Sequence, residues 1–76
     1  MNEKRRKSLR VALDHLEKAA SIVMDASAEE QDAYDNLPEN FQCGDIGDKM
    51  DEAISNLEEA ECLIDDATRL IGETIE

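Results

Sequence analysis

The chain has 76 residues, a formal net charge of −12 and only 3% aromatic residues, with no Trp. A chain of this length forms one small domain, and so few aromatic side chains leave little material for a compact core. The negative charge disfavours extended binding to DNA, RNA or anionic lipid, although salt screens charges beyond roughly 10 Å and a local basic region keeps its own character.

Residues 1–10, which we call the basic segment, hold five of the eight basic residues of the chain: Lys4, Arg5, Arg6, Lys7 and Arg10. Glu3 is the only acid there, so the segment carries +4, whereas the three basic residues and nineteen acids of residues 11–76 give −16. Cations at a helix N-terminus oppose the helix dipole, at ~0.3–1 kcal/mol each. This placement therefore needs compensation or a function.

Apolar residues from Leu9 onwards recur at alternating steps of four and three, which predicts a helix over about residues 3–35. The stripe consists of Leu9, Leu13, Leu16, Ala20, Val23, Tyr34 and Leu37. It is wider than a coiled-coil seam because it also includes Val11, Ala12, Ala19, Ile22 and Ala26. This width predicts a helix with two neighbours.

The stretch YDNLPENFQCGDIG holds the only Pro and two of the three Gly residues. Pro38 disfavours helical backbone at Leu37, so the first helix is expected to end near Asp35. A short turn, PENF, is expected next, with Leu37 and Phe41 closing the end of a bundle. Because the whole turn, residues 36–44, is short, the two helices should be antiparallel neighbours.

The helical pattern resumes over about residues 45–74. Its stripe consists of Ile46, Met50, Ala53, Leu57, Ala60, Ile64, Ala67 and Ile71, with Ile54, Leu63 and Leu70 at its flanks. We expect Asp45 to cap this helix, because its side chain can accept from the free N–H groups of the first turn. Asp48 and Asp51 suit the positive end of the dipole.

Residues 1–76 thus predict a single all-α domain, an antiparallel two-helix hairpin. Small scaffolds of this length rarely reach useful stability without disulfides, metals or partners. Cys43 and Cys62 fit no redox or zinc motif, and roughly 20 Å of helix between them excludes an intramolecular disulfide. We therefore expect a homo-oligomeric helical bundle, with two hairpins forming a four-helix bundle, or alternatively a tetramer.

No residue pattern indicates catalysis, a cofactor or a metal ion. The single His, His15, has no nucleophile at a recognisable position beside it, and Ala12 stands where a di-iron bundle needs Glu. The stretch DIGDKMDE lacks the spacing of a calcium loop, and the Gly residues form no phosphate loop. No apolar run approaches the ~20 residues of a membrane span. We expect a cytoplasmic, non-enzymatic protein.

The basic segment has two possible partners. In the hairpin it lies beside the end of the second helix, where Glu73 and Glu76 can neutralise it. In an oligomer of antiparallel hairpins it approaches the turn of another copy, where Arg can fork onto a phosphate, an aromatic ring can stack on a base and Asn can bond the edge of that base. The candidate ligand-binding residues are Lys4, Arg5, Arg6, Arg10, Tyr34, Asn36, Asn40 and Phe41.

The second helix also carries a dense acidic face, formed by Glu58, Glu59, Glu61, Asp65 and Asp66. Charge runs of this kind usually serve as solvated surface. Alternatively, the spaced carboxylates imitate phosphates and occupy a protein that binds nucleic acid. The chain would then act as an inhibitor that binds another protein.

The run EEQDAYDNLPENFQ, followed by a Gly-containing turn and MDEAISNLEEA, resembles small acidic helical-hairpin proteins encoded by phages and conjugative elements of Gram-positive bacteria. Those proteins also open with a short basic segment. Small phage proteins of similar build include anti-defence sponges, which are oligomers that sequester nucleotide signals of bacterial immunity. The resemblance implies binding without a reaction.

These observations together predict a phage or mobile-element protein that forms a dimer or tetramer in the host cytoplasm. Its expected function is to bind and sequester a small anionic ligand, a nucleotide immune signal. The alternative function is inhibition of a host defence protein through the acidic face. Direct binding of DNA, RNA or a membrane is not expected.

Overall fold

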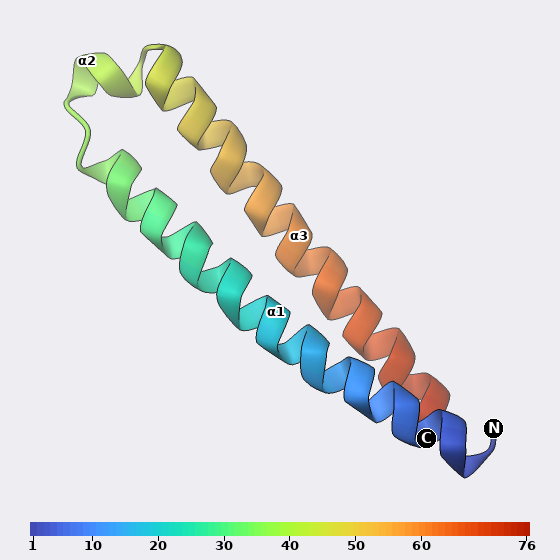
Figure 1. Ribbon diagram of the computed structural model, residues 1–76. Helices are drawn as coiled ribbons and strands as arrows, with labels where there is room; N and C mark the ends of the chain where they lie inside the picture. Colours follow the sequence, from blue (N-terminus) through green and yellow to red (C-terminus); the bar gives the residue numbers. More distant parts are fainter.

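The computed structural model describes all residues, 1–76, and consists of three helices and no strand. Helix α1 spans Glu3–Asp35, α2 spans Glu39–Gln42 and α3 spans Asp45–Ile75. The two long helices run side by side in opposite directions, so that both ends of the chain lie at one end of a rod and α2 at the other (Figure 1). The rod measures 58 × 14 × 13 Å. The predicted all-α architecture is confirmed.

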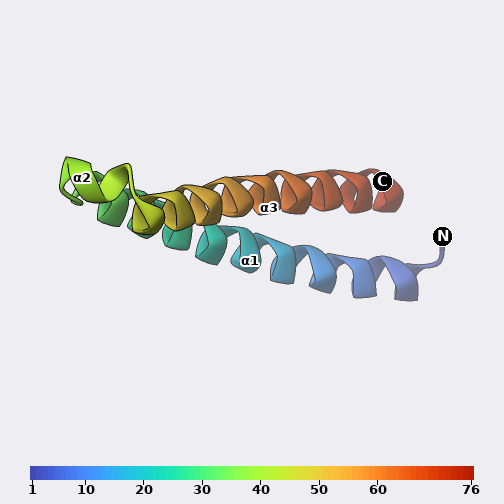
Figure 2. The same ribbon diagram turned by 90° about the horizontal axis from the view of Figure 1, so that it is seen from above.

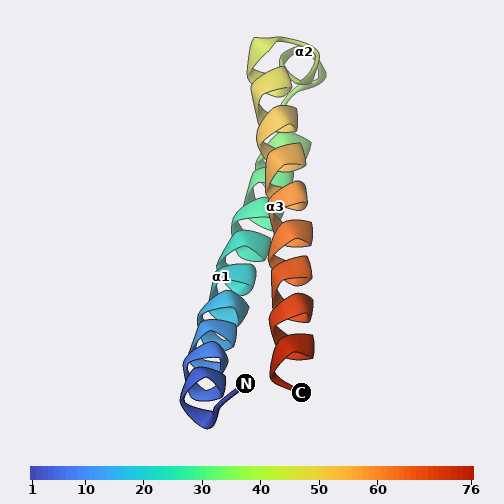
Figure 3. The same cartoon turned by 90° about the vertical axis from the view of Figure 1, so that its right-hand side faces the viewer.

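Helices α1 and α3 wrap around each other, as the two perpendicular views show (Figures 2 and 3). The residues along their contact recur at alternating steps of three and four, the a and d positions of a heptad repeat. In α1 this seam consists of Arg6, Leu9, Leu13, Leu16, Ala20, Val23, Ser27, Glu30 and Tyr34; in α3 it consists of Gly47, Met50, Ile54, Leu57, Glu61, Ile64, Thr68, Ile71 and Ile75. Every one of them is buried or half-buried.

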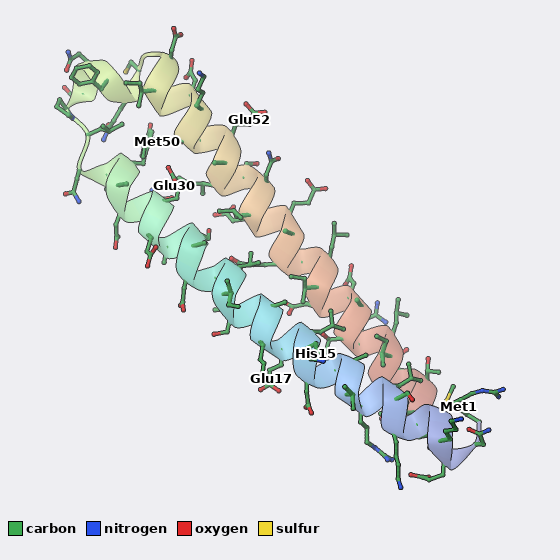
Figure 4. The ribbon with its side chains drawn as sticks, viewed as in Figure 1. Met1, His15, Glu17, Glu30, Met50 and Glu52 are labelled. Atoms are coloured by element: carbon green, nitrogen blue, oxygen red, sulfur yellow. The ribbon has the colours of Figure 1, made fainter.

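The seam is only one layer of side chains thick. Three of the 76 residues are buried, Ser27, Gly47 and Ile54, and Ile54 is the only large apolar side chain among them. Figure 4 shows Glu30 and Met50 between the two long helices, so even a carboxylate takes part in the seam. The hairpin therefore has a contact line rather than a core.

A second apolar surface, which we call the alanine face, lies along one side of the seam. In an antiparallel pair the g positions of both helices fall on the same side, next to the d positions. They include Ala12, Ala19 and Ala26 in α1 and Ala53, Ala60 and Ala67 in α3. Three of the adjoining c positions carry large apolar side chains, Ile22, Leu63 and Leu70, which are 69%, 61% and 53% exposed, and the other c positions are polar. The extra width of both sequence stripes is thus an apolar face that the hairpin covers only in part.

The opposite side of the hairpin is polar. Positions e and b carry most of its charged groups, including Asp14, Glu17, Asp51, Glu58 and Asp65. Figure 4 shows Glu17 and Glu52 pointing away from the neighbouring helix. None of the three helices is long and apolar enough to cross a membrane.

The turn is held together by hydrogen bonds to the carbonyl of Tyr34. This oxygen accepts from the Leu37 N–H at 3.1 Å and from Nε2 of Gln42 at 3.0 Å. Leu37 is half-buried, but Phe41 projects from α2 and is 47% exposed. The expectation that Phe41 closes the bundle end is therefore wrong for the single hairpin, because nearly half of this side chain stays exposed.

The prediction that Asp45 caps the second long helix is also wrong. Gly44 occupies the cap position in extended backbone, with no side-chain cap hydrogen bond, and Asp45 is the first helical residue. The carbonyl of Gly44 accepts the first helical hydrogen bond, from the Asp48 N–H at 3.0 Å. Asp45 and Asp48 lie in the first turn, where their charges favour the positive end of the dipole.

Gly47 marks the closest approach of α2 to α3. It is buried, and a Cβ at this position would overlap the backbone of Gln42, at 2.7 Å from its Cα. No side chain fits there, because backbone atoms cannot move aside as the end of a flexible side chain can. This glycine therefore lets the turn fold onto the start of α3.

We predict that Gly47→Ala lowers the free energy of unfolding by about 1–3 kcal/mol, because the new methyl group forces α2 away from α3. Gly72→Ala is the matched control: a Cβ there meets nothing within 4 Å. Since Ala is the better helix former, this control should unfold at the same or a higher urea concentration than the wild type. The unfolding midpoints of both variants are measured by urea unfolding followed by far-UV circular dichroism. Equal midpoints for the two variants would contradict the packing described for the turn.

Candidate ligand-binding site

Residues 3–10 of the basic segment form the first two turns of α1, and Asn2 is the N-cap of this helix. The Oδ1 atom of Asn2 accepts a hydrogen bond from the Arg5 N–H at 2.9 Å. This cap satisfies one of the free N–H groups at the helix start and offsets part of the cost of placing cations there. The apolar periodicity does not point to Asn2, although Asn just before a helical stripe is a usual N-cap signal.

Only part of the positive charge in the basic segment is compensated. Glu3 pairs with Arg10 at 3.1 Å and with Arg6 at 3.8 Å. The side chains of Lys4, Arg5 and Lys7 are exposed, and no carboxylate lies within 4.0 Å of them. The segment thus presents three unpaired cations to solvent.

The acidic end of α3 does not supply direct partners for these cations. Both ends of the chain lie at the same end of the rod (Figure 1), and Figure 4 labels Met1 there. However, Glu73 pairs with Arg69 of its own helix at 3.4 Å, and no ion pair joins α1 to α3. Of the two partners considered for the basic segment, the hairpin's own end makes no salt bridge with it.

The remaining candidate residues lie at the turn. Tyr34 is half-buried at the last seam position of α1, and the N–H of Asn36 donates to the Asp32 carbonyl at 3.1 Å where α1 ends. Asn40 and Phe41 are exposed on α2. Thirty residues of helix separate Lys4 from Tyr34, roughly 45 Å at ~1.5 Å per residue. The eight candidate residues therefore form two groups, at opposite ends of the rod, that one hairpin cannot bring to the same small ligand.

The electrostatic surroundings of Tyr34 are negative. Desolvation raises the pKa of its phenol above the ordinary 10.0, and the charges of Asp51, Cys43, Asp48 and Asp35 raise it further. The phenol therefore stays neutral at physiological pH and can donate a hydrogen bond. Because the turn is acidic, an anion bound there needs cations from elsewhere.

The rest of the surface offers no enclosed site. The only hollow is lined by Asp14, Glu17, Lys18 and Ser21, all from the polar side of α1. A single helix cannot surround a ligand. No group of three or more His, Cys, Asp or Glu side chains is placed to hold a metal ion, and both cysteines are free and exposed.

The acidic face of α3 is smaller than the sequence suggests. Glu61 is half-buried at a seam position and turned towards α1, so its assignment to the exposed face is wrong. Asp66 lies 4.0 Å from Arg69. Glu58, Glu59 and Asp65 are exposed and have no cationic partner. Three unpaired carboxylates thus remain on the acidic face, on which the alternative function, inhibition of another protein, depends.

No protein-family model, curated protein or solved structure matches the chain. The arrangement of its charges and apolar faces is therefore the basis for the function proposed below. The resemblance to hairpin proteins of phages and conjugative elements stays a prediction.

Because Tyr34 is the only tyrosine, ultraviolet titration of the protein reports its ionisation alone. We predict an apparent pKa above 10.0 in the folded protein. Asp51→Asn should lower it towards that value, whereas Asp14→Asn, far along α1, should leave it unchanged. Since the native state holds the proton more tightly than the unfolded chain, the free energy of unfolding should fall as the pH rises through 10.0 and beyond. An unshifted pKa would contradict the negative surroundings assigned to the turn.

Proposed function

We propose that this protein is a non-enzymatic homo-oligomer that binds and sequesters a small anionic ligand of the nucleotide class. The observation that carries the proposal is the set of three exposed cations, Lys4, Arg5 and Lys7, left without a carboxylate in a chain with a net charge of −12. In this proposal the protein belongs to a phage or mobile element and acts in the cytoplasm of the host on a nucleotide immune signal.

A phosphate group suits the basic segment better than a carboxylate side chain does. Its several oxygens can accept from more than one cation at once, and the Arg guanidinium offers a planar fork that matches phosphate geometry. The segment already lies on a capped helix, so its backbone is ordered before the ligand binds. Binding a multivalent anion also removes the repulsion among neighbouring cations.

The turn carries groups that can bind the base of a nucleotide, which the basic segment lacks. Phe41 exposes nearly half of its surface, which leaves a ring face free to stack on a base, and the exposed Asn40 can bond the edge of that base. In one hairpin these groups lie at the wrong end of the rod. The proposed site is therefore composite, with the basic segment of one copy beside the turn of another.

The second candidate function is inhibition of a host defence protein through the acidic face. The observation in its favour is that Glu58, Glu59 and Asp65 are exposed and unpaired. Spaced carboxylates of this kind can occupy a surface that normally binds phosphates. This function would not require the basic segment.

We predict that replacing both Lys4 and Arg5 with Gln weakens nucleotide binding at least tenfold, because each charge-assisted hydrogen bond contributes about 1.5–3 kcal/mol. Native mass spectrometry of the protein with cyclic and linear nucleotides measures the bound mass. The matched control is Lys18→Gln, which removes an exposed lysine from the middle of the same helix. This control should bind like the wild type, and both variants should keep the wild-type helix content.

The triple variant Glu58→Gln, Glu59→Gln, Asp65→Asn separates the two candidate functions. It should retain nucleotide binding if the basic segment forms the site, and it should lose only an activity that depends on the acidic face. If the wild type binds no nucleotide at high micromolar concentration, the sequestration proposal is wrong and the acidic face becomes the better candidate.

A further inference from the structure

We propose that a second copy of this chain docks on the alanine face in antiparallel orientation, so that the turn of each copy lies beside the basic segment of the other. This inference deepens the proposed function, on which it rests, because it names the partner that completes the composite site. Three features of the hairpin support this pairing: its excess surface, the composition of the alanine face and the separation of charge along the rod.

The hairpin exposes more surface than a folded monomer of its size. Its accessible area is 5678 Å², whereas a monomer of 8.5 kDa is expected to expose about 4,650 Å². The excess of about 1,000 Å² is close to the ~800 Å² that each partner buries in a standard interface. An interface with one further molecule along the length of the rod would bury this excess surface.

The alanine face is the side of the rod that can make this contact. Its alanines allow the helices of two copies to approach near the lower end of the usual ~8–10 Å interaxial range. Ile22, Leu63 and Leu70 project beside them and supply the larger apolar side chains. The opposite side carries Asp51, Glu58 and Asp65, which would repel their counterparts in a second copy.

Charge along the rod decides the orientation. The end that holds both chain termini, residues 1–10 and 67–76, has six basic and three acidic side chains, a formal charge of +3. The turn end, residues 30–52, has eight acidic side chains and one lysine, a formal charge of −7. A parallel pair would place the two turn ends, each with a charge of −7, beside each other. An antiparallel pair places the +3 end of one copy beside the −7 turn end of the other, at both ends of the pair. Electrostatic complementarity therefore selects the antiparallel pair.

The antiparallel arrangement determines which helices of the two copies pack against each other. Its two-fold axis crosses the helices at mid-length, so α1 packs against α1 of the second copy and α3 against α3. The middle residues of the two helices are Ala19 in Glu3–Asp35 and Ala60 in Asp45–Ile75, both on the alanine face. Each then meets its own counterpart. In a parallel pair, Ala19 would instead face α3 of the second copy.

The ligand site follows from the same arrangement. Arg5 occupies the g position at the start of α1, in line with the alanines, and the antiparallel pair carries it to the turn end of the second copy. The exposed Phe41 and Asn40 belong to that turn end. The pair therefore contains two equivalent composite sites, one at each end.

Cysteine cross-linking tests the arrangement with small substitutions. Ala19→Cys is made in a chain whose native cysteines are replaced, Cys43→Ser and Cys62→Ser, and is oxidised without nucleotide. We expect a disulfide-linked dimer as the main species on a non-reducing gel, because the two Cβ atoms meet at the two-fold axis. The matched control is Ser21→Cys on the polar side of α1, which should stay monomeric on the gel.

Two outcomes overturn the inference. If neither Ala19→Cys nor Ala60→Cys cross-links alone but the double variant Ala19→Cys, Ala60→Cys does, the pair is parallel. If no alanine-face cysteine cross-links faster than Ser21→Cys, the face is not the interface. Nucleotide binding by the wild type is measured separately, so the inference can fail while the proposed function stands, and the reverse also holds.

A second pair of variants measures the strength of the interface. Ala26→Arg places a charge on the alanine face, and Ala28→Arg places the same charge two residues away on the polar side. We expect the first to raise the dimer dissociation constant at least tenfold in sedimentation velocity, and the second to leave it within twofold. Equal dissociation constants would contradict the assignment of the face.

Discussion

The property on which the rest of this structure depends is that two helices in contact can cover only one stripe of each other. The hairpin uses its a and d positions for that contact and buries a single large apolar side chain, Ile54. The apolar residues at positions g and c stay partly or largely exposed, although burying such surface is the main driving force for folding and association. The chain is thus folded into a rod whose second apolar side stays largely exposed in the single hairpin.

The distribution of charge along the rod favours one orientation of a second copy. A rod 58 Å long keeps its basic and acidic ends beyond the screening length of roughly 10 Å, so they cannot neutralise each other within one hairpin. The same separation divides the candidate ligand residues into two groups. An antiparallel pair would bring together both the opposite charges and the two groups of ligand residues, because it places the cations of one copy beside the acidic turn of the other, which carries Phe41.

Much of the helical architecture could be predicted from local signals. Alternating steps of three and four mark long helices, and Pro38 together with two nearby glycines marks the turn. Periodicity did not reveal which apolar face meets the neighbouring helix. The expected stripe of the second helix was centred on Ala53 and Ala60, whereas the structure places Ile54 at the centre and these alanines at its flank. Two overlapping apolar faces have the same period, and only packing separates them.

Polar residues in the seam were the other feature that the pattern concealed. The predicted stripe of the first helix jumps from Val23 to Tyr34, because Ser27 and Glu30 are not apolar, yet both face α3. Glu61 was assigned to the acidic face for the same reason. Heptad position rather than residue type decides what faces a neighbour, and polar groups at such positions can fix the register of a helix pair. The candidate site was predictable only as residue types, since a single hairpin holds its two halves at opposite ends of the rod.

Sedimentation equilibrium of the wild-type protein tests the central claim most directly, because it measures mass without a ligand, a label or a substitution. The claim that the hairpin needs a partner for its second apolar face predicts a mass of about 17 kDa, twice the 8.5 kDa of one chain, at micromolar concentration. A mass of 8.5 kDa up to high micromolar concentration, from a protein that is fully helical by circular dichroism, would contradict it.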